Sequence, residues 1–141
     1  MTQEWKHIFE DPSIEYEIDN KLDLIKWSRK GLTLKNLHAI LDYTSLTIKD
    51  VAQIIALSER QLQRYTEDQV LRIDISVQLL QIVELYAKGY EVFGEKEKFK
   101  QWMIHPNTAF SALKPLELLD TSFGIQMVKD ELGRIEHGIV S

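Results

Sequence analysis

The chain has 141 residues, of which 44% are hydrophobic and 28% are charged, which is typical of one globular domain or of two small helical units that share a core. It contains no cysteine, which excludes disulfides and thiolate metal sites, and its four histidines are scattered along the chain. The net charge of −5 argues against a general polyanion binder. Neither a signal peptide nor a run of roughly 18 uncharged apolar residues occurs, so we expect a soluble, cytoplasmic protein without a membrane partner.

The charges are unevenly distributed along the chain. Residues 31–72 carry equal numbers of basic and acidic side chains, whereas the segments on both sides are acidic. If nucleic acid binds, we expect it at this neutral middle segment, with a modest phosphate contribution per chain.

The first half begins with two predicted helices. One follows Asp11-Pro12-Ser13 and ends at Lys30-Gly31, a basic last turn followed by a C-terminal glycine. Its apolar positions recur at helical spacing: Ile14, Ile18, Leu22 and Ile25. A second helix ends near residues 43–45. Its apolar positions are Leu34, Leu37, Ile40 and Leu41.

Residues 46–67 predict a helix-turn-helix. Thr47 is placed to cap one short helix and Ser58 to cap the next, with only two residues between them. Two short helices cross steeply when a small residue lies at their contact, and Ala52 provides it. Since Ala56 occupies a turn position where glycine is frequent, we expect the turn to be made without a residue that favours positive φ.

The second short helix is a candidate for reading DNA in the major groove. Arginine bonds guanine edges bidentately and glutamine does the same for adenine. The candidate DNA-binding residues are Ser58, Glu59, Arg60, Gln61, Gln63 and Arg64. The alternative is a solvated face of an ordinary helix in an all-α protein.

The second half contains the longest periodic run, a predicted scaffold helix from Asp74 to Gly94. Its aromatic residues Tyr86, Tyr90 and Phe93 fit either a ligand box or a core, and helical spacing favours the core. A shorter helix follows, with inward-facing side chains Phe99, Trp102 and Met103.

Two prolines delimit the next segment. His105-Pro106-Asn107 is expected to end the preceding helix, with Asn107 starting the next turn. Pro115 is well placed at the start of a further short helix.

The final stretch divides into two parts. Residues 121–132 have the pattern of an amphipathic helix capped by Thr121. After Leu132, Gly133 is a poor residue for a helix interior and Gly138 loosens the chain again. Charge and hydrogen-bonding capacity come from Arg134, Glu136 and His137. Residues 133–141 therefore predict either a recognition hook, which becomes fully ordered only with a partner, or a frayed end.

The motifs from Gly31 to Ser141 resemble, in order, those of the Xre/MbcA/ParS antitoxins, which are partners of RES-domain toxins in type II toxin–antitoxin operons. The shared motifs are LSERQLQRY, the EVFG that ends the long helix, a following W and HPN, PLELLDTSFG, and the closing LGRIEHG. The sequence departs at Ser111-Ala112, where similar proteins tend to have a glycine pair.

The resemblance implies an all-α fold and a homodimer. It implies a helix-turn-helix region in residues 1–72 that represses the protein's own operon, and a toxin-binding domain in residues 73–141. The toxins of such systems resemble ADP-ribosyltransferases and consume NAD or transfer from it. The NAD chemistry would then belong to the partner, and we expect no cofactor, metal or catalytic residue in this chain.

The hypothesis for inhibition is that the terminal helix docks on the toxin and the tail blocks its NAD pocket. The candidate toxin-binding residues are Ile125, Val128, Leu132, Gly133, Arg134, Ile135, Glu136, His137 and Gly138. Glycines would let the backbone pass close to a pocket wall, and charged groups would occupy polar sites meant for the dinucleotide. The main alternative is a stand-alone regulator whose C-terminal half dimerises or senses a ligand. A protein inhibitor without a DNA role comes third, and an enzyme last.

Overall fold

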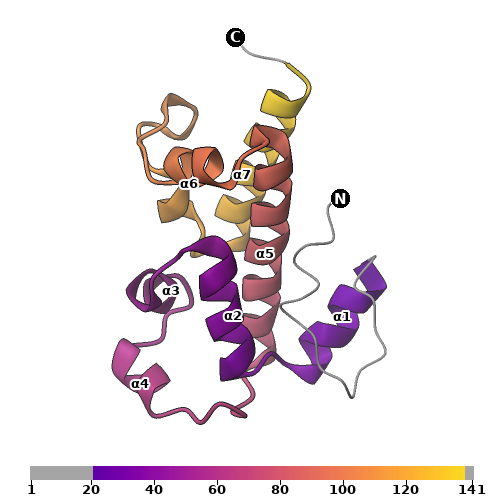
Figure 1. Ribbon diagram of the computed structural model, residues 1–141, viewed down its shortest axis with the longest axis vertical. Helices are drawn as coiled ribbons and strands as arrows, with labels where there is room; N and C mark the ends of the chain where they lie inside the picture. The colour runs from indigo at the N-terminus through magenta and orange to yellow at the C-terminus, as the bar shows by residue number, and fades with distance from the viewer. Residues whose placement is uncertain (1–20, 139–141) are drawn as a thin grey trace.

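The computed structural model describes residues 21–138, and over these residues the fold is all-α, as predicted (Figure 1). Two isolated β-bridges join loop residues in this part of the chain. The helices and 3-10 turns are α1 (Lys21–Lys30), α2 (Leu34–Thr44), α3 (Ile48–Ile54), α4 (Glu59–Gln63), α5 (Ile73–Phe93), α6 (Lys96–Met103), η2 (Thr108–Phe110), η3 (Pro115–Leu118) and α7 (Ser122–Glu136).

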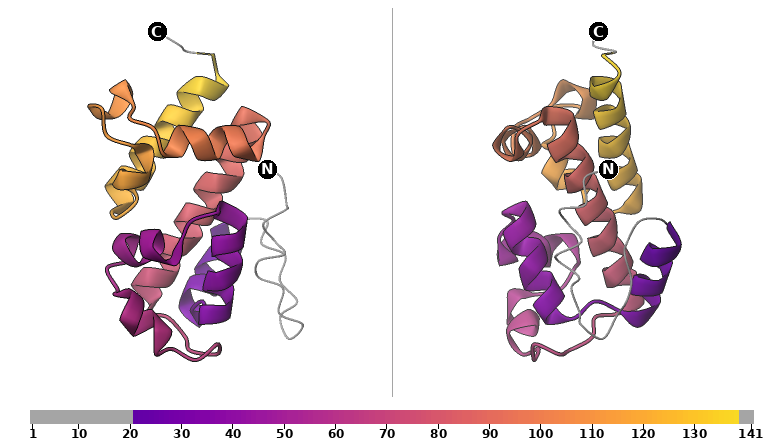
Figure 2. Two further views of the ribbon diagram at one scale, coloured as in Figure 1. Left: turned by 60° about the vertical axis from the view of Figure 1, so that its left-hand side comes forward. Right: turned by 45° about the vertical axis from the view of Figure 1, so that its right-hand side comes forward.

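The long helix α5 is the scaffold of the molecule. Helices α1, α2, α6 and α7 all pack against it, and the two views of Figure 2 show the early helices around its first half and the late ones around its second. Its buried residues, Leu79, Ile82 and Val83 among them, belong to one hydrophobic cluster that includes residues from both halves. The expected boundary between residues 72 and 73 coincides with the start of α5, and the division into two domains stays a prediction.

Helix α1 ends at Lys30 as predicted, but its buried face differs from the predicted one. Leu22 and Ile25 are 65% and 43% exposed, whereas Trp27 is buried. The predicted residues Ile14 and Ile18 lie outside the described part of the chain. The indole removes more apolar area from water than either aliphatic side chain, so its position decides which face packs inward.

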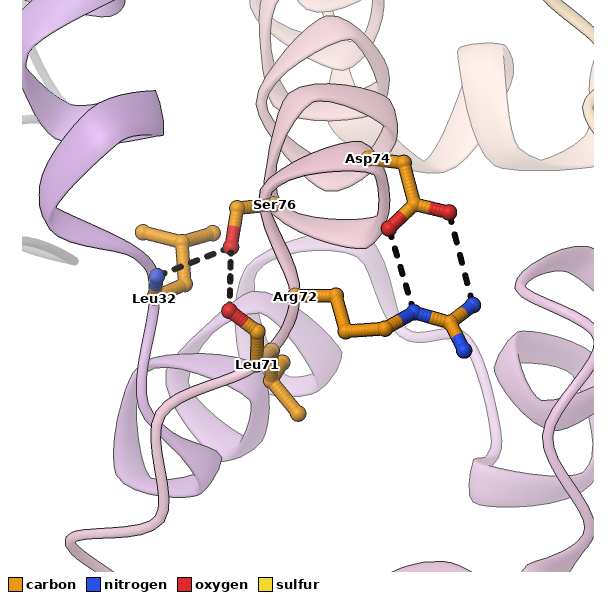
Figure 3. A network of polar contacts seen from close by, with 5 residues as sticks. All are labelled: Leu32, Leu71, Arg72, Asp74 and Ser76. Carbon is orange, nitrogen blue, oxygen red and sulfur yellow. Dashed lines mark hydrogen bonds and ion pairs between the residues drawn. The ribbon is translucent and has the colours of Figure 1, made fainter.

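The start of α5 is tied to the turn between α1 and α2 (Figure 3). The Leu32 amide donates to the buried Ser76 hydroxyl at 2.9 Å, and this hydroxyl donates to the Leu71 carbonyl at 3.4 Å. Nearby, Arg72 donates to Asp74 from Nε and Nη2, and these bonds hold the pKa of this carboxyl below its usual value. The chain is therefore fixed where it leaves the α4 region.

The aromatic residues of α5 form a core, which confirms the interpretation favoured by their spacing. Tyr86, Tyr90 and Phe93 each pack against the Phe99 ring of α6, with centroid separations between 5.1 and 5.8 Å. A Cβ atom on Gly89 would collide with this ring, so glycine permits the close approach of α5 and α6. Burial raises the pKa of both tyrosines.

The loop between α6 and α7 carries the turn chemistry predicted for it. Asn107 accepts from the Ala109 amide at 2.9 Å, and Pro115 begins η3. Ser111 and Ala112 both adopt positive φ values, 54° and 68°. This is the left-handed region that glycine occupies without strain, which gives a physical reason for a glycine pair at these positions.

Candidate functional site

Both helices of the α3–α4 unit begin directly after the residues predicted to cap them. The Thr47 hydroxyl accepts from the Asp50 amide at 3.1 Å, and the Ser58 hydroxyl accepts from the Gln61 amide at 3.0 Å. In return, the side chains of Asp50 and Gln61 accept from the backbone amides of Thr47 and Ser58, so both helices start with a complete capping box. These bonds are local in sequence, which is why the pattern alone located them.

The turn between the two helices is made at Ala56, a residue that does not favour positive φ, as expected. Ala56 adopts φ +56°, so the turn contains a left-handed residue even though it is not glycine. The following amide, of Leu57, donates to the Ala52 carbonyl at 3.1 Å, which holds the turn closed. Ala52 itself is buried, as expected for the small residue at the contact. The left-handed conformation of Ala56 carries a modest energetic cost.

Helix α4 presents its candidate residues to solvent and buries Leu62, which is only 2% exposed. The two arginines of the group, Arg60 and Arg64, are both exposed. Gln61 has a structural task as well, because its side-chain oxygen accepts from the Ser58 amide at 2.8 Å. DNA reading by this surface stays a prediction, and Gln61 is its weakest member because one end of its amide is engaged.

Helix α7 starts at the predicted cap but in a crowded position. The Thr121 hydroxyl accepts from the Gly124 amide at 3.1 Å. A Cβ atom at Gly124 would collide with the carbonyl of Leu118, the last residue of η3. The glycine is therefore needed for the close approach of α7 to η3, a requirement that the sequence pattern did not indicate.

The predicted docking face of α7 is corrected by its burial. Ile125, Val128 and Leu132 are 5%, 0% and 0% exposed, and they belong to the hydrophobic core of the protein itself. Helix α7 packs along α5, which removes these side chains from any external partner. A periodic apolar stripe indicates burial, but it does not distinguish the protein's own core from a partner's surface.

The end of α7 is also different from the expected hook. The helix continues through Gly133 and Ile135 to Glu136, so residues 133–136 are helical. Glu136 accepts from Lys88 of α5 at 3.4 Å, and both side chains are partly shielded from solvent. The expectation that the helix ends at Leu132 is therefore wrong for residues 133–136. Full ordering of the tail by a bound toxin stays a prediction, and residues 139–141 lie outside the described part of the chain.

The exposed side of α7 carries a different stripe. Phe123 is 83% exposed and Met127 is 49% exposed. Both belong to a series at three- and four-residue steps, which places its members along one side of a helix. The members of this exposed stripe are Phe123, Met127, Asp130, Arg134 and His137. The stripe is apolar at its start and carries Arg134 and His137 near its end. The sequence pattern did not indicate it, because the apolar periodicity of the buried side is stronger.

Two classes of site find no support in the described residues. Residues 21–138 contain no group of three or more histidine or acidic side chains placed to hold a metal ion. No helix in the same range has the length and apolar character of a membrane span.

The structure therefore defines an all-α protein with two separate exposed helical surfaces, one on α4 and one on α7, joined by a scaffold helix. Residues 88–138 match the family described as the antitoxin Xre/MbcA/ParS C-terminal toxin-binding domain. This part of the chain is accordingly similar to the Xre/MbcA/ParS antitoxins, in agreement with the resemblance carried by its motifs.

Three relatives described as "Antitoxin Xre" share this similarity. The protein of Pseudomonas putida is 36% identical over 93 residues, which cover 66% of this chain and 58% of the relative. The protein of Photorhabdus laumondii is 29% identical over 79% of this chain and 77% of its own length. That of Yersinia enterocolitica is 26% identical over 84% and 81%. The chain thus spans less than two thirds of the first of these relatives.

Proposed function

We propose that this protein is an antitoxin that binds and neutralises a RES-domain toxin through its C-terminal half and represses its own operon through α4. The match of residues 88–138 to a toxin-binding domain supports the first part. The observation that carries it is the exposed stripe of α7, which lies within that range and leaves an aromatic side chain 83% exposed.

The exposed stripe suits a helix-in-groove contact. In that mode an amphipathic helix inserts anchors spaced three or four residues apart into an apolar groove of the partner. Phe123 and Met127 provide such a pair of anchors, and aromatic anchors contribute most when they become fully desolvated. The buried stripe of the same helix holds α7 on α5, so the anchors are presented by a rigid element rather than by a loop.

Blocking of the NAD pocket is proposed for the end of α7. Arg134 and His137 are exposed and lie on the same stripe as the anchors. A guanidinium is suited to carboxylate or phosphate groups at a pocket entrance, because it donates two parallel hydrogen bonds. Gly138 adopts φ +68° and ends the helical run, which lets the chain turn toward a pocket wall. Inhibition would then be steric exclusion of NAD, and Glu136 would support the tail through Lys88 instead of entering the pocket.

The toxin-binding proposal is tested with the full chain and the product of the adjacent gene, which the proposal expects to be a RES-domain protein. Phe123→Ala combined with Met127→Ala should weaken the complex by roughly 2 kcal/mol or more, because both anchors are removed without touching the core. Lys129→Ala, which changes a partly exposed residue of α7 outside the stripe, is the matched control. Affinity is measured by titration calorimetry, and protection of cells is scored in parallel. Unchanged affinity of the double variant would place the toxin contact elsewhere.

The DNA-binding proposal is tested with the DNA upstream of the operon at fixed ionic strength. Arg60→Ala and Arg64→Ala should each weaken operator binding by about 1–3 kcal/mol if each arginine reads one base. Lys49→Ala on α3 serves as a control for the loss of one exposed positive charge. If all three variants bind the operator as tightly as the parent chain, α4 does not read bases. If the parent chain itself does not bind the operator, the chain is better described as a protein inhibitor alone. Operator binding without any toxin complex would favour the stand-alone regulator.

A further inference from the structure

The α3–α4 unit and the start of α7 meet at one side chain of the scaffold helix. Gln78 of α5 donates from Nε2 to the Ile54 carbonyl at 2.9 Å and to the Leu119 carbonyl at 3.0 Å. An amide nitrogen carries two hydrogens, so one side chain can make both bonds at once. Because both partners are carbonyls, the orientation of the amide is also fixed by chemistry.

The two carbonyls belong to residues at the end of α3 and at the entry to α7, where the orientation of each helix is set. Ile54 is the last residue of α3, and a helix end leaves its carbonyls without partners in the helix. Leu119 follows η3 directly and comes just before the Thr121 cap of α7. The side-chain amide of Gln78 therefore supplies a donor to a carbonyl at the end of α3 and, at the same time, holds the residue that leads into α7.

Two hollows adjoin this joint. One, of about 380 Å³, is partly lined by Ile54 and Asp120. The other, of about 470 Å³, is partly lined by Gln78, Gln81 and Asp120. The side chains of Ile54 and Leu119 are buried in the hydrophobic core, whereas Gln78 lies on the wall of the second hollow and is less closely packed.

We infer that Gln78 is a positioning residue that sets the orientation of the α3–α4 unit relative to η3 and α7. Its two bonds add directional constraints to the packing of Ile54 and Leu119 and thereby fix the angle between the surface on α4 and the surface on α7. For operator and toxin binding, this inference rests on the proposed function. A toxin contact that displaces Leu119 would also displace Ile54, because Gln78 bonds both carbonyls. Any resulting coupling between the two partners is reciprocal in their affinities.

The orientation is measurable without either partner. The chain contains no cysteine, so Lys49→Cys on α3 and Gln126→Cys on α7 give two unique positions for nitroxide labels. Pulsed electron resonance on the full chain should give one narrow distance distribution. Gln78→Met keeps the length of the side chain and removes both donors, while Gln78→Glu keeps it polar but leaves only acceptors. Both variants should broaden or shift this distribution.

The matched control is Gln81→Met, one turn along α5 on the wall of the second hollow, since Gln81 bonds neither carbonyl. It should leave the distance distribution unchanged. Distributions in both Gln78 variants that match the parent chain would overturn the inference, as would an equal change in Gln81→Met. The Glu variant also provides the measurement if the Met variant does not fold.

A second readout separates this inference from the proposed function. Operator affinity of Gln78→Met should fall severalfold relative to Gln81→Met at equal folded fraction, with no base-contacting residue altered. A broadened distance distribution with unchanged operator affinity supports the positioning role and counts against DNA reading by α4. An unchanged distribution with normal operator binding of the parent chain overturns the positioning role and leaves the proposed function intact.

Discussion

Helices α4 and α7 both carry candidate binding residues, but the two sets differ in their exposure to solvent. The candidates on α4 are exposed, and the one buried residue of this short helix is Leu62. On α7, the predicted docking residues Ile125, Val128 and Leu132 are buried against the scaffold helix. A short polar helix buries little of itself, whereas the apolar stripe of a long helix is first used for the protein's own core.

The largest expected effect comes from the two sides of α7. Leu132→Ala should lower the free energy of unfolding by about 2–5 kcal/mol, because it leaves a cavity in the core. Met127→Ala, on the exposed side, should change it by about 0.5 kcal/mol. Urea unfolding followed by circular dichroism measures both. Equal stability of the two variants would contradict the assignment of the inward and outward sides, and a larger loss in Met127→Ala would reverse it.

The two glycines of α7 provide a sharper contrast of opposite sign. Gly124→Ala should destabilise the protein by about 1–3 kcal/mol, because its methyl group collides with the Leu118 carbonyl. Gly133→Ala should stabilise it by about 1 kcal/mol, because no described atom outside the helix lies within 4 Å of the new methyl and alanine favours a helix. Thermal unfolding of the two variants checks the signs. Destabilisation by Gly133→Ala would indicate that the last turn of α7 is not helical in solution.

The smallest expected effect concerns the turn before α4. Ala56→Gly should raise the free energy of unfolding by about 1 kcal/mol, because glycine adopts φ +56° without the strain that a side chain imposes. Ala52→Gly, in the body of α3, is the matched control and should lower it by a similar amount. The same denaturant titration measures both. A loss of stability in Ala56→Gly would mean that the turn is not left-handed at this residue.

Features that depend on neighbours in sequence were predictable. The caps at Thr47, Ser58 and Thr121 act within three residues, so the helices they start were located from the pattern. The end of the scaffold helix at Gly94 and the aromatic core around Phe99 follow from equally local rules. The motifs in their order likewise indicated the family that residues 88–138 match.

Tertiary packing decided which surface each helix shows. The periodicity of α7 defines two stripes. The packing of α7 on α5 decides which stripe is buried, and Phe123 lies on the exposed one. The same dependence explains α1, where Trp27 rather than Ile25 faces inward. Contacts between distant segments also bear on the last turn of α7. This turn is helical at Gly133, and Glu136 at its end pairs with Lys88 of α5, which is far away in sequence. These outcomes depend on contacts between distant segments, and a local pattern carries no information about such contacts.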